Sequence, residues 1–174
     1  RLQVEHGITE EITGLDLVEI QIRIARGESI EGLVVEERGV AIEARVCAED
    51  PDANFLPAPG LITCFDPALG PRVRIDSGVT VGTSVSPDFD SLIAKVIATG
   101  ENRAEARARL EYALRDFDLV VEGGASNKGY LLELLSTEAY NAGPVDTNWL
   151  DRWNLQRDQA RKSSESQAQD AFVA

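Results

Sequence analysis

Methionine is absent from this sequence of 174 residues, histidine occurs once and cysteine twice. Because the sequence starts with arginine and has no methionine, we expect it to be a piece of a longer protein. A Ser-His-Asp catalytic triad is set aside, because His6 is the one histidine. His6 is predicted to serve local packing or hydrogen bonding. Cys47 and Cys64 lie in strand-like segments without close metal-ligand spacing, which predicts reduced core thiols rather than a disulfide or metal pair.

Basic clusters and long apolar runs are also missing. The sequence has 30 Asp and Glu against 17 Lys and Arg, a net charge of -13, and shows no basic patch for nucleic acid or an anionic membrane. No stretch approaches the roughly 20 apolar residues that span a bilayer, and no signal peptide opens the sequence. Gly123-Gly124 lacks the spacing of a phosphate-binding loop. We therefore expect a cytoplasmic protein that binds neither nucleic acid nor membrane.

The length of 174 residues predicts one domain, or one domain with an appendage, and 43% hydrophobic residues suffice to bury a core. A helical stripe over residues 15–26 ends at Gly27, and residues 40–46 alternate like a half-buried antiparallel strand. Other strands are expected at residues 61–65, 72–76, 91–99 and 118–122, and other helices after Asn102, after Ser126 or Asn127, and after Thr147. Strands followed by packed helices predict an α+β fold with a mostly antiparallel sheet.

The first six residues alternate in a way that predicts a strand with one functional face. In an extended segment Arg1, Gln3 and Glu5 would point one way at intervals of roughly 7 Å, while Leu2 and Val4 would face a core. A guanidinium and an amide can hold a small planar oxyanion such as bicarbonate, and a carboxylate beside them can take its proton. The alternative is an ordinary half-buried strand whose outer face carries mixed charge.

Several segments in order resemble biotin carboxylases, over roughly residues 1 to 150. The likeness is to the C-terminal part of the biotin carboxylase component of acyl-CoA, pyruvate and urea carboxylases. One such segment would be moderately specific, but six in the family's order are strongly specific. The six segments are RLQVEHGITE (1–10), TGLDLV (13–18), GVAIEAR (39–45), AEDP (48–51), FLP (55–57) and DSLIAK (90–95).

The resemblance implies a ligase reaction in which ATP and bicarbonate give carboxyphosphate and ADP, and the carboxyl group passes to a biotin ureido nitrogen. The positions that match the family's bicarbonate site are Arg1, Gln3, Val4 and Glu5. Glu5 matches the proposed general base, and Val4 would act through its backbone. Arg74 matches the family's cation for the biotin anion, and Asp76, on the same strand face, could orient it.

Other polar residues are expected to be structural. Lys95 lies in an apolar strand, so its stem would reach toward solvent or it would pair with a carboxylate such as Glu43. Glu49 and Asp50 are interpreted as turn and strand-end residues rather than a metal pair, because the family's magnesium carboxylate lies upstream of Arg1. The sequence departs from the family pattern at three places. Gly7 replaces the usual proline in the turn after the first strand, and Phe89 replaces tyrosine before the DSLIAK segment. Residues 124–127 replace Val-Lys-Thr-Asn in the loop before residue 128.

The resemblance also implies a division of the chain and what lies outside it. Residues 1–27 would end an ATP-grasp lobe, residues 28–150 would form the C-terminal domain, and residues 151–174 would be a polar helical tail or linker. ATP and Mg²⁺ would be bound mainly by residues outside this chain, and biotin would arrive on a carrier. We therefore expect the fragment alone to be inactive. Its partners would be the carrier and the carboxyltransferase, with a homodimer as one allowed assembly.

Two alternatives remain open from the sequence. One is a fragment of another ATP-grasp ligase, such as a relative of carbamoyl-phosphate synthase or of the purine-biosynthesis enzymes. The Gln3-Val4-Glu5-His6 and Phe55-Leu56-Pro57 segments favour the biotin branch over it. The other alternative is a noncatalytic module that keeps the scaffold for subunit assembly.

Overall fold

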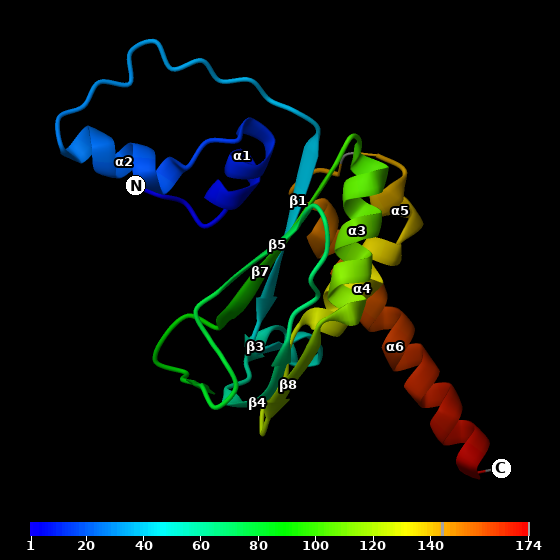
Figure 1. Ribbon diagram of the computed structural model, residues 1–174. Coiled ribbons are helices and arrows are strands. Elements are labelled where there is room, and N and C mark those ends of the chain that lie inside the picture. The colour runs from blue at the N-terminus through cyan, green and yellow to red at the C-terminus, as the bar shows by residue number, and fades with distance from the viewer. Residues whose placement is uncertain (144, 174) are drawn as a thin grey trace. The chain divides into compact units, whose positions relative to one another are not determined.

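The computed structural model describes residues 1–143 and 145–173. The chain forms two compact units, which divide between Ser136 and Thr137. The first unit contains antiparallel strands with helices, and the second contains helices (Figure 1). The predicted α+β class with a mostly antiparallel sheet is therefore confirmed.

The central sheet of the first unit has the strand order β1-β7-β5, with every pair antiparallel. Its strands are β1 (Val40–Cys47), β7 (Leu92–Gly100) and β5 (Val73–Ser77). The middle strand β7 is buried along almost its whole length, as its unbroken apolar run predicts. In β1 the buried residues alternate with more exposed ones, so Ile42, Ala44 and Val46 share the core face while Glu43 and Arg45 point to the other.

Helix α3 (Arg103–Asp116) covers the apolar face of this sheet, and α1 (His6–Thr13) lies on the opposite side (Figure 1). The Asn102 side chain caps α3 by accepting a hydrogen bond from the Glu105 N–H, as the capping pattern predicts. The helix then buries an apolar stripe made of Ala106, Leu110, Ala113 and Leu114.

A second sheet places β4 (Gly60–Asp66) between β6 (Ser84–Val85) and β8 (Asp118–Glu122). A short ladder of β2 (Glu49–Asp50) with β3 (Leu56–Pro57) flanks the 3-10 turn η1 (Pro51–Ala53), and α4 (Lys128–Ser136) ends the unit. Asp50 caps η1 and Glu49 accepts a hydrogen bond from Ser91, so both act as the turn and strand-end residues that were expected. Cys47 and Cys64 are free and half-buried, and burial raises the pKa of the Cys47 thiol to about 11.

The strand predicted for residues 1–6 is wrong. Residues 1–3 have no regular structure, residues 4 and 5 form a turn, and α1 starts at His6. The turn is closed by the His6 N–H, which donates to the Gln3 carbonyl over 3.2 Å. A strand needs a ladder partner, and no part of the described chain pairs with residues 1–5. Gly7 does not lie in a turn after a strand, as its place in the family pattern implies, but is buried inside α1 near Ile97.

Helix α2 (Leu17–Ala25) has the caps that its sequence predicts. The Asp16 side chain accepts from the Glu19 N–H, and Gly27 turns the chain with a positive φ of 88°. Its apolar stripe is not buried, however, since Val18, Ile22 and Ile24 are more than 40% exposed. An amphipathic pattern shows only that a helix has an apolar face, and the described residues leave most of this one exposed.

The second unit contains α5 (Glu138–Asn141) and α6 (Trp149–Val173). Thr137 caps α5, and in α6 the rings of Trp149 and Trp153 stack with their centroids 6.0 Å apart. The polar segment after Gln156 thus continues a helix. In the described ranges, no helix is long and apolar enough to cross a bilayer.

Lys95 is a buried cation in the middle of the central sheet, only 7% exposed. Its ammonium lies 3.0 Å from Asp76 on the neighbouring strand and donates to the Val4 carbonyl over 3.1 Å. The prediction that Lys95 pairs with a carboxylate is confirmed. The partner is Asp76 and not Glu43, because Asp76 stands directly opposite Lys95 in the β5–β7 register. Partial burial pushes the pKa of Asp76 upward, but the hydrogen bonds and charges of Arg74 and Lys95 outweigh it and hold that pKa below its ordinary value.

We expect Gly100→Ala to destabilise the protein more than Gly78→Ala. A Cβ at Gly100 would lie 2.6 Å from the Ala106 backbone nitrogen, whereas one at Gly78 would meet nothing within 4 Å. Overpacking against backbone costs about 1–3 kcal/mol. Urea unfolding of both variants measures the difference, and equal midpoints would contradict this packing of α3 on β7.

We expect the stabilising effect of Asp76 to depend on pH. The folded pKa of Asp76 is lowered, so its stabilisation is complete above the unfolded pKa of about 4 and is lost as the pH falls through the lower folded value. The difference in unfolding free energy between the wild type and Asp76→Asn should therefore be largest above about pH 4 and shrink below it. Urea titrations at a series of pH values measure it, and a difference that stays constant down to about pH 2 would show that no such linkage exists.

Candidate active site

Charged side chains gather on the face of the central sheet that α1 overlies. The strand register places them in two adjacent rows, and residues directly opposite in such rows have Cβ atoms about 5 Å apart. One row across β1, β7 and β5 is Arg45, Lys95 and Asp76, and the next is Glu43, Ile97 and Arg74. Residues far apart in the sequence are thereby brought within reach of one another and of the N-terminal turn.

Arg74 is surrounded by carboxylates. Its Nε and Nη2 donate to the two oxygens of Asp76 over 2.7 and 3.0 Å, so Asp76 orients the guanidinium as the strand alternation predicts. Its Nη1 donates to Glu10 of α1 over 2.7 Å, and Glu11 lies 3.6 Å away. The hydrogen bond to Asp76 raises the pKa of Arg74 above its ordinary value, so the group is a fixed cation. Three of its five N–H groups donate to Asp76 and Glu10, and Nη1 also forms an ion pair with Glu11.

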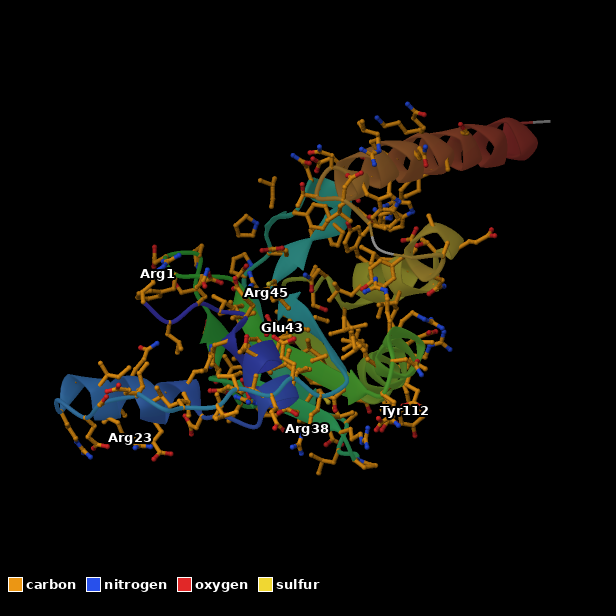
Figure 2. The ribbon with its side chains drawn as sticks, turned by 90° about the horizontal axis from the view of Figure 1, so that it is seen from above. Arg1, Arg23, Arg38, Glu43, Arg45 and Tyr112 are labelled. Atoms are coloured by element: carbon orange, nitrogen blue, oxygen red, sulfur yellow. The ribbon has the colours of Figure 1, made fainter. Side chains whose placement is uncertain are left out.

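Glu5 lies in the N-terminal turn and contacts the sheet through Arg45. Arg45 Nη2 donates to Glu5 Oε2 over 3.0 Å. Arg45 Nε donates to Glu43 Oε1 over 3.2 Å, and Figure 2 shows Arg45 and Glu43 next to each other. The Glu43 side chain is only 3% exposed, and its Oε2 has no hydrogen-bond partner among the described residues. Glu5 Oε1 likewise has no partner in the described part of the chain, so this oxygen can accept a proton or a hydrogen bond.

Val4 joins the site through its backbone, because its carbonyl accepts the hydrogen bond from buried Lys95. Lys95 therefore connects the N-terminal turn to Asp76 and, through it, to Arg74. The prediction that Leu2 and Val4 face a core is wrong, since they are 37% and 44% exposed. The absence of a strand at residues 1–5 removes the alternation on which that prediction depended.

Arg1 and Gln3 are not part of this cluster. Both are exposed, and no described residue forms a hydrogen bond with either side chain. Figure 2 shows Arg1 beyond the pair of Glu43 and Arg45, on the outer part of the N-terminal segment. Gln3 acts through its carbonyl, which also lies 2.7 Å from His6 Nδ1, so His6 has the local hydrogen-bonding role that was expected. Among the predicted site residues, the structure brings together Val4, Glu5 and Arg74.

Sequence reasoning missed three charged members of the cluster, namely Glu10, Glu43 as the anchor of Arg45, and Arg45 itself. The alternation of β1 contains a signal for two of them, because it places Glu43 and Arg45 on the face away from the core. Glu10 has no such signal, since its contact depends on where α1 docks. Within the described residues, no group of three His, Cys, Asp or Glu side chains is placed to hold a metal ion.

The chain can therefore offer a proton acceptor and a fixed cation on one sheet face. The groups that remain for a ligand are Glu5 Oε1 and the N–H groups of Arg74 that donate to neither Asp76 nor Glu10, of which those on Nη1 lie near Glu11. A free carboxylate oxygen can accept the acidic proton of a small anion, and a guanidinium held in place can meet negative charge that forms on a ligand.

The proteins similar to this chain are named as biotin carboxylases or as subunits of biotin-dependent carboxylases. Biotin carboxylase 1 of Bacillus subtilis is 43% identical over 157 residues, which are 89% of this chain and 34% of that protein. The biotin-dependent acyl-coenzyme A carboxylase alpha3 subunit of Mycobacterium leprae is 45% identical over 161 residues, 88% of this chain and 26% of that protein. The chain thus spans about a third or less of the length of these relatives.

A solved structure shares the fold: the biotin carboxylase domain of 2-oxoglutarate carboxylase from Hydrogenobacter thermophilus, in complex with MgADP, ADP and bicarbonate. It matches with a TM-score of 0.82 and 33% identity over 87% of this chain and 34% of that one. The family described as carbamoyl-phosphate synthase L chain, ATP binding domain, matches residues 1–33. The family described as biotin carboxylase C-terminal domain matches residues 43–152, well over half of the sequence, and this chain belongs to that family.

Proposed function

We propose that this chain supplies the bicarbonate and biotin side of a biotin carboxylase, an ATP-dependent ligase that carboxylates biotin on a carrier protein. The observation that carries the proposal is the double contact of Lys95. Its ammonium bonds the Val4 carbonyl, which precedes Glu5, and also Asp76, which orients Arg74. A proton acceptor and a fixed cation are thereby held on one rigid sheet face, as a reaction that first activates bicarbonate and then an anionic biotin needs.

In this proposal Glu5 is the general base toward bicarbonate. Arg45 holds one oxygen of Glu5, and the other is free to take the proton. Loss of that proton makes bicarbonate a better nucleophile toward the γ-phosphate of ATP. Arg1, Gln3 and the Val4 backbone would contact bicarbonate beside Glu5, and since Arg1 and Gln3 are exposed, their side chains are free to turn toward it.

Arg74 would meet the negative charge that forms on biotin when its ureido nitrogen loses a proton. Two of its N–H groups are not engaged by Asp76 or Glu10, and a donor already held in place stabilises developing charge without reorganising. Three carboxylates lie near the guanidinium, so it is oriented before any ligand arrives.

ATP and Mg²⁺ would be held mainly by residues outside this chain, with residues 1–27 as the end of an ATP-grasp lobe and residues 28–150 as the C-terminal domain. The match of residues 1–33 to an ATP-binding family supports this division. The partners would be the biotin carrier and the carboxyltransferase, with self-association as a dimer, in the cytoplasm. The relative named as a carboxylase subunit and the solved structure described as a biotin carboxylase domain dimer support such an assembly.

The alternatives are less well supported. The ATP-binding match is named for carbamoyl-phosphate synthase, but it covers residues 1–33, and the C-terminal match is named for biotin carboxylase. A noncatalytic scaffold would not need Arg74 and Glu5 to be oriented by a dedicated network of charges.

In the protein that joins this chain to its ATP-binding lobe, we expect Glu5→Gln to lower the kcat of biotin carboxylation by roughly 10²- to 10⁴-fold, because a general base is lost. Arg74→Ser is expected to cost about 10²- to 10³-fold in the same assay, because a donor to the anion is lost. The matched control is Arg72→Ser, since Arg72 is an exposed arginine that pairs with Glu101. Unchanged carboxylation in both Glu5 and Arg74 variants would favour the scaffold.

We expect the 174-residue chain by itself to catalyse neither ATP cleavage nor biotin carboxylation, because it contains only the proposed end of the lobe that would hold ATP. Phosphate release from ATP is measured with and without bicarbonate. Bicarbonate-dependent release by the purified chain would refute the proposed division of the site.

A further inference from the structure

The outer edge of strand β1 has no strand beside it in the described part of the chain. The central sheet has the order β1-β7-β5, so β1 pairs with β7 on one side only. That pairing is itself irregular, because the register of β1 against β7 shifts between Val46 and Cys47. A shift of this kind interrupts the ladder and bends the strand locally. The C-terminal end of β1 therefore needs another partner if its side chains are to keep fixed directions.

A single asparagine takes the place of a neighbouring strand at this end of β1. Asn127 Oδ1 accepts from the Cys47 N–H over 2.9 Å, and Asn127 Nδ2 donates to the Arg45 carbonyl over 3.1 Å. The main-chain N–H of Asn127 donates to the Cys47 carbonyl, also over 3.1 Å. Arg45 and Cys47 are two residues apart, so both direct their main-chain groups to the same edge of the strand. A carboxamide offers an acceptor and donors as a peptide unit does, which lets it imitate the missing strand.

The burial of Asn127 shows that this contact is directional. The residue is only 7% exposed, and a buried polar group costs free energy unless it is hydrogen-bonded. Both the oxygen and the nitrogen of its amide are bonded here, and a satisfied buried network favours one arrangement of the chain over others. Aspartate could not replace it, because a carboxylate has no N–H to donate to the Arg45 carbonyl.

The carbonyl that Asn127 holds belongs to a residue of the candidate site. Arg45 Nη2 donates to Glu5 Oε2 over 3.0 Å, and the side chains of Arg45 and Glu5 are about half exposed. A long exposed side chain can adopt many rotamers, so the direction in which it leaves the sheet limits where its guanidinium can reach. The main chain of β1 sets that direction, at the point where Asn127 holds it.

We propose that Asn127 is a positioning residue for the candidate active site and acts through the main chain of Arg45; this inference rests on the proposed function, in which Glu5 is the general base. Asn127 comes from the loop between β8 and α4, and its side chain bonds the main chain of β1 rather than a charged group. Loss of its amide frees the end of β1 to shift against β7. A shift of about 1 Å at a catalytic group can lower a rate roughly 100-fold.

The experiment uses the full protein that joins this chain to its ATP-binding lobe. Asn127→Ala removes both side-chain bonds, and Asn127→Asp loses the donor to Arg45 but keeps the acceptor toward Cys47. The matched control is Lys128→Met. Lys128 is the next residue, and its ammonium donates to the Phe117 carbonyl at the end of α3, so the control removes a partly buried bond of the same segment without touching β1. The measurements are kcat for bicarbonate-dependent ATP cleavage, KM for ATP, and the thermal unfolding midpoint, with rates taken where each variant is folded.

For both Asn127 variants we expect kcat to fall roughly 10- to 100-fold, with KM for ATP within about twofold of the wild type because the nucleotide site is not disturbed. Lys128→Met should lower the unfolding midpoint, because a hydrogen bond is lost, and leave kcat within about twofold of the wild type. Where Asn127→Ala does not fold, Asn127→Asp decides, since it keeps the shape of the side chain. An unchanged kcat in a folded Asn127 variant, or an equal loss of kcat in Lys128→Met, would overturn the inference.

The double variant Asn127→Ala with Arg45→Met separates positioning from a general structural effect. If Asn127 acts through Arg45, the double variant should be no slower than Arg45→Met alone. Losses that multiply would show that Asn127 acts elsewhere and would overturn the inference. A normal kcat for Glu5→Gln would instead reject the proposed function, whereas a slow Glu5→Gln with normal Asn127 variants would reject only the positioning role.

Discussion

The burial of one ammonium group organises the first unit of this protein. Lys95 lies in the middle strand of the central sheet with 7% of its surface exposed, and a buried cation is tolerated only when it is paired and hydrogen-bonded. Asp76 supplies the charge and the Val4 carbonyl supplies a further acceptor. The second partner matters most for the site, because it ties the N-terminal turn to the sheet although that turn has no ladder of its own.

Several features of the candidate site follow from this constraint. Asp76 shares its carboxylate between Lys95 and Arg74, so the group that neutralises the buried cation also orients the proposed catalytic one. With the turn held at Val4, Glu5 comes within reach of Arg45 on the edge strand β1. Gly7 lets α1 approach closely, since a Cβ there would lie 2.5 Å from the Ile97 side chain. Close approach of α1 in turn brings Glu10 to Arg74.

The sequence pattern correctly predicted those strands and helices whose formation depends on residues near them in the sequence. The unbroken apolar run of β7, the alternation of β1 and the Asn102 cap of α3 each depend on nearby residues, and the structure confirms them. The pattern misled where the outcome depends on distant residues. Residues 1–6 alternate like a strand, yet no described strand pairs with them. Gly7 lies inside helix α1, where it packs close to the distant residue Ile97. The stripe of α2 was correctly placed on a helix, but its burial could not be inferred from periodicity alone.

The sequence by itself determined the α+β class, the family to which the chain belongs, and the identity of the residues proposed for the site, because ordered motifs and side-chain alternation are properties of the sequence. It also indicated that Asp76 would orient Arg74, since both lie on one face of the same strand. Only the tertiary structure decided that Lys95 pairs with Asp76 rather than Glu43, that Arg45 holds Glu5, and that Arg1 and Gln3 lie outside the cluster. Those contacts depend on the register of β1, β7 and β5 and on the docking of α1, which join residues up to 91 positions apart and leave no mark in any short stretch of sequence.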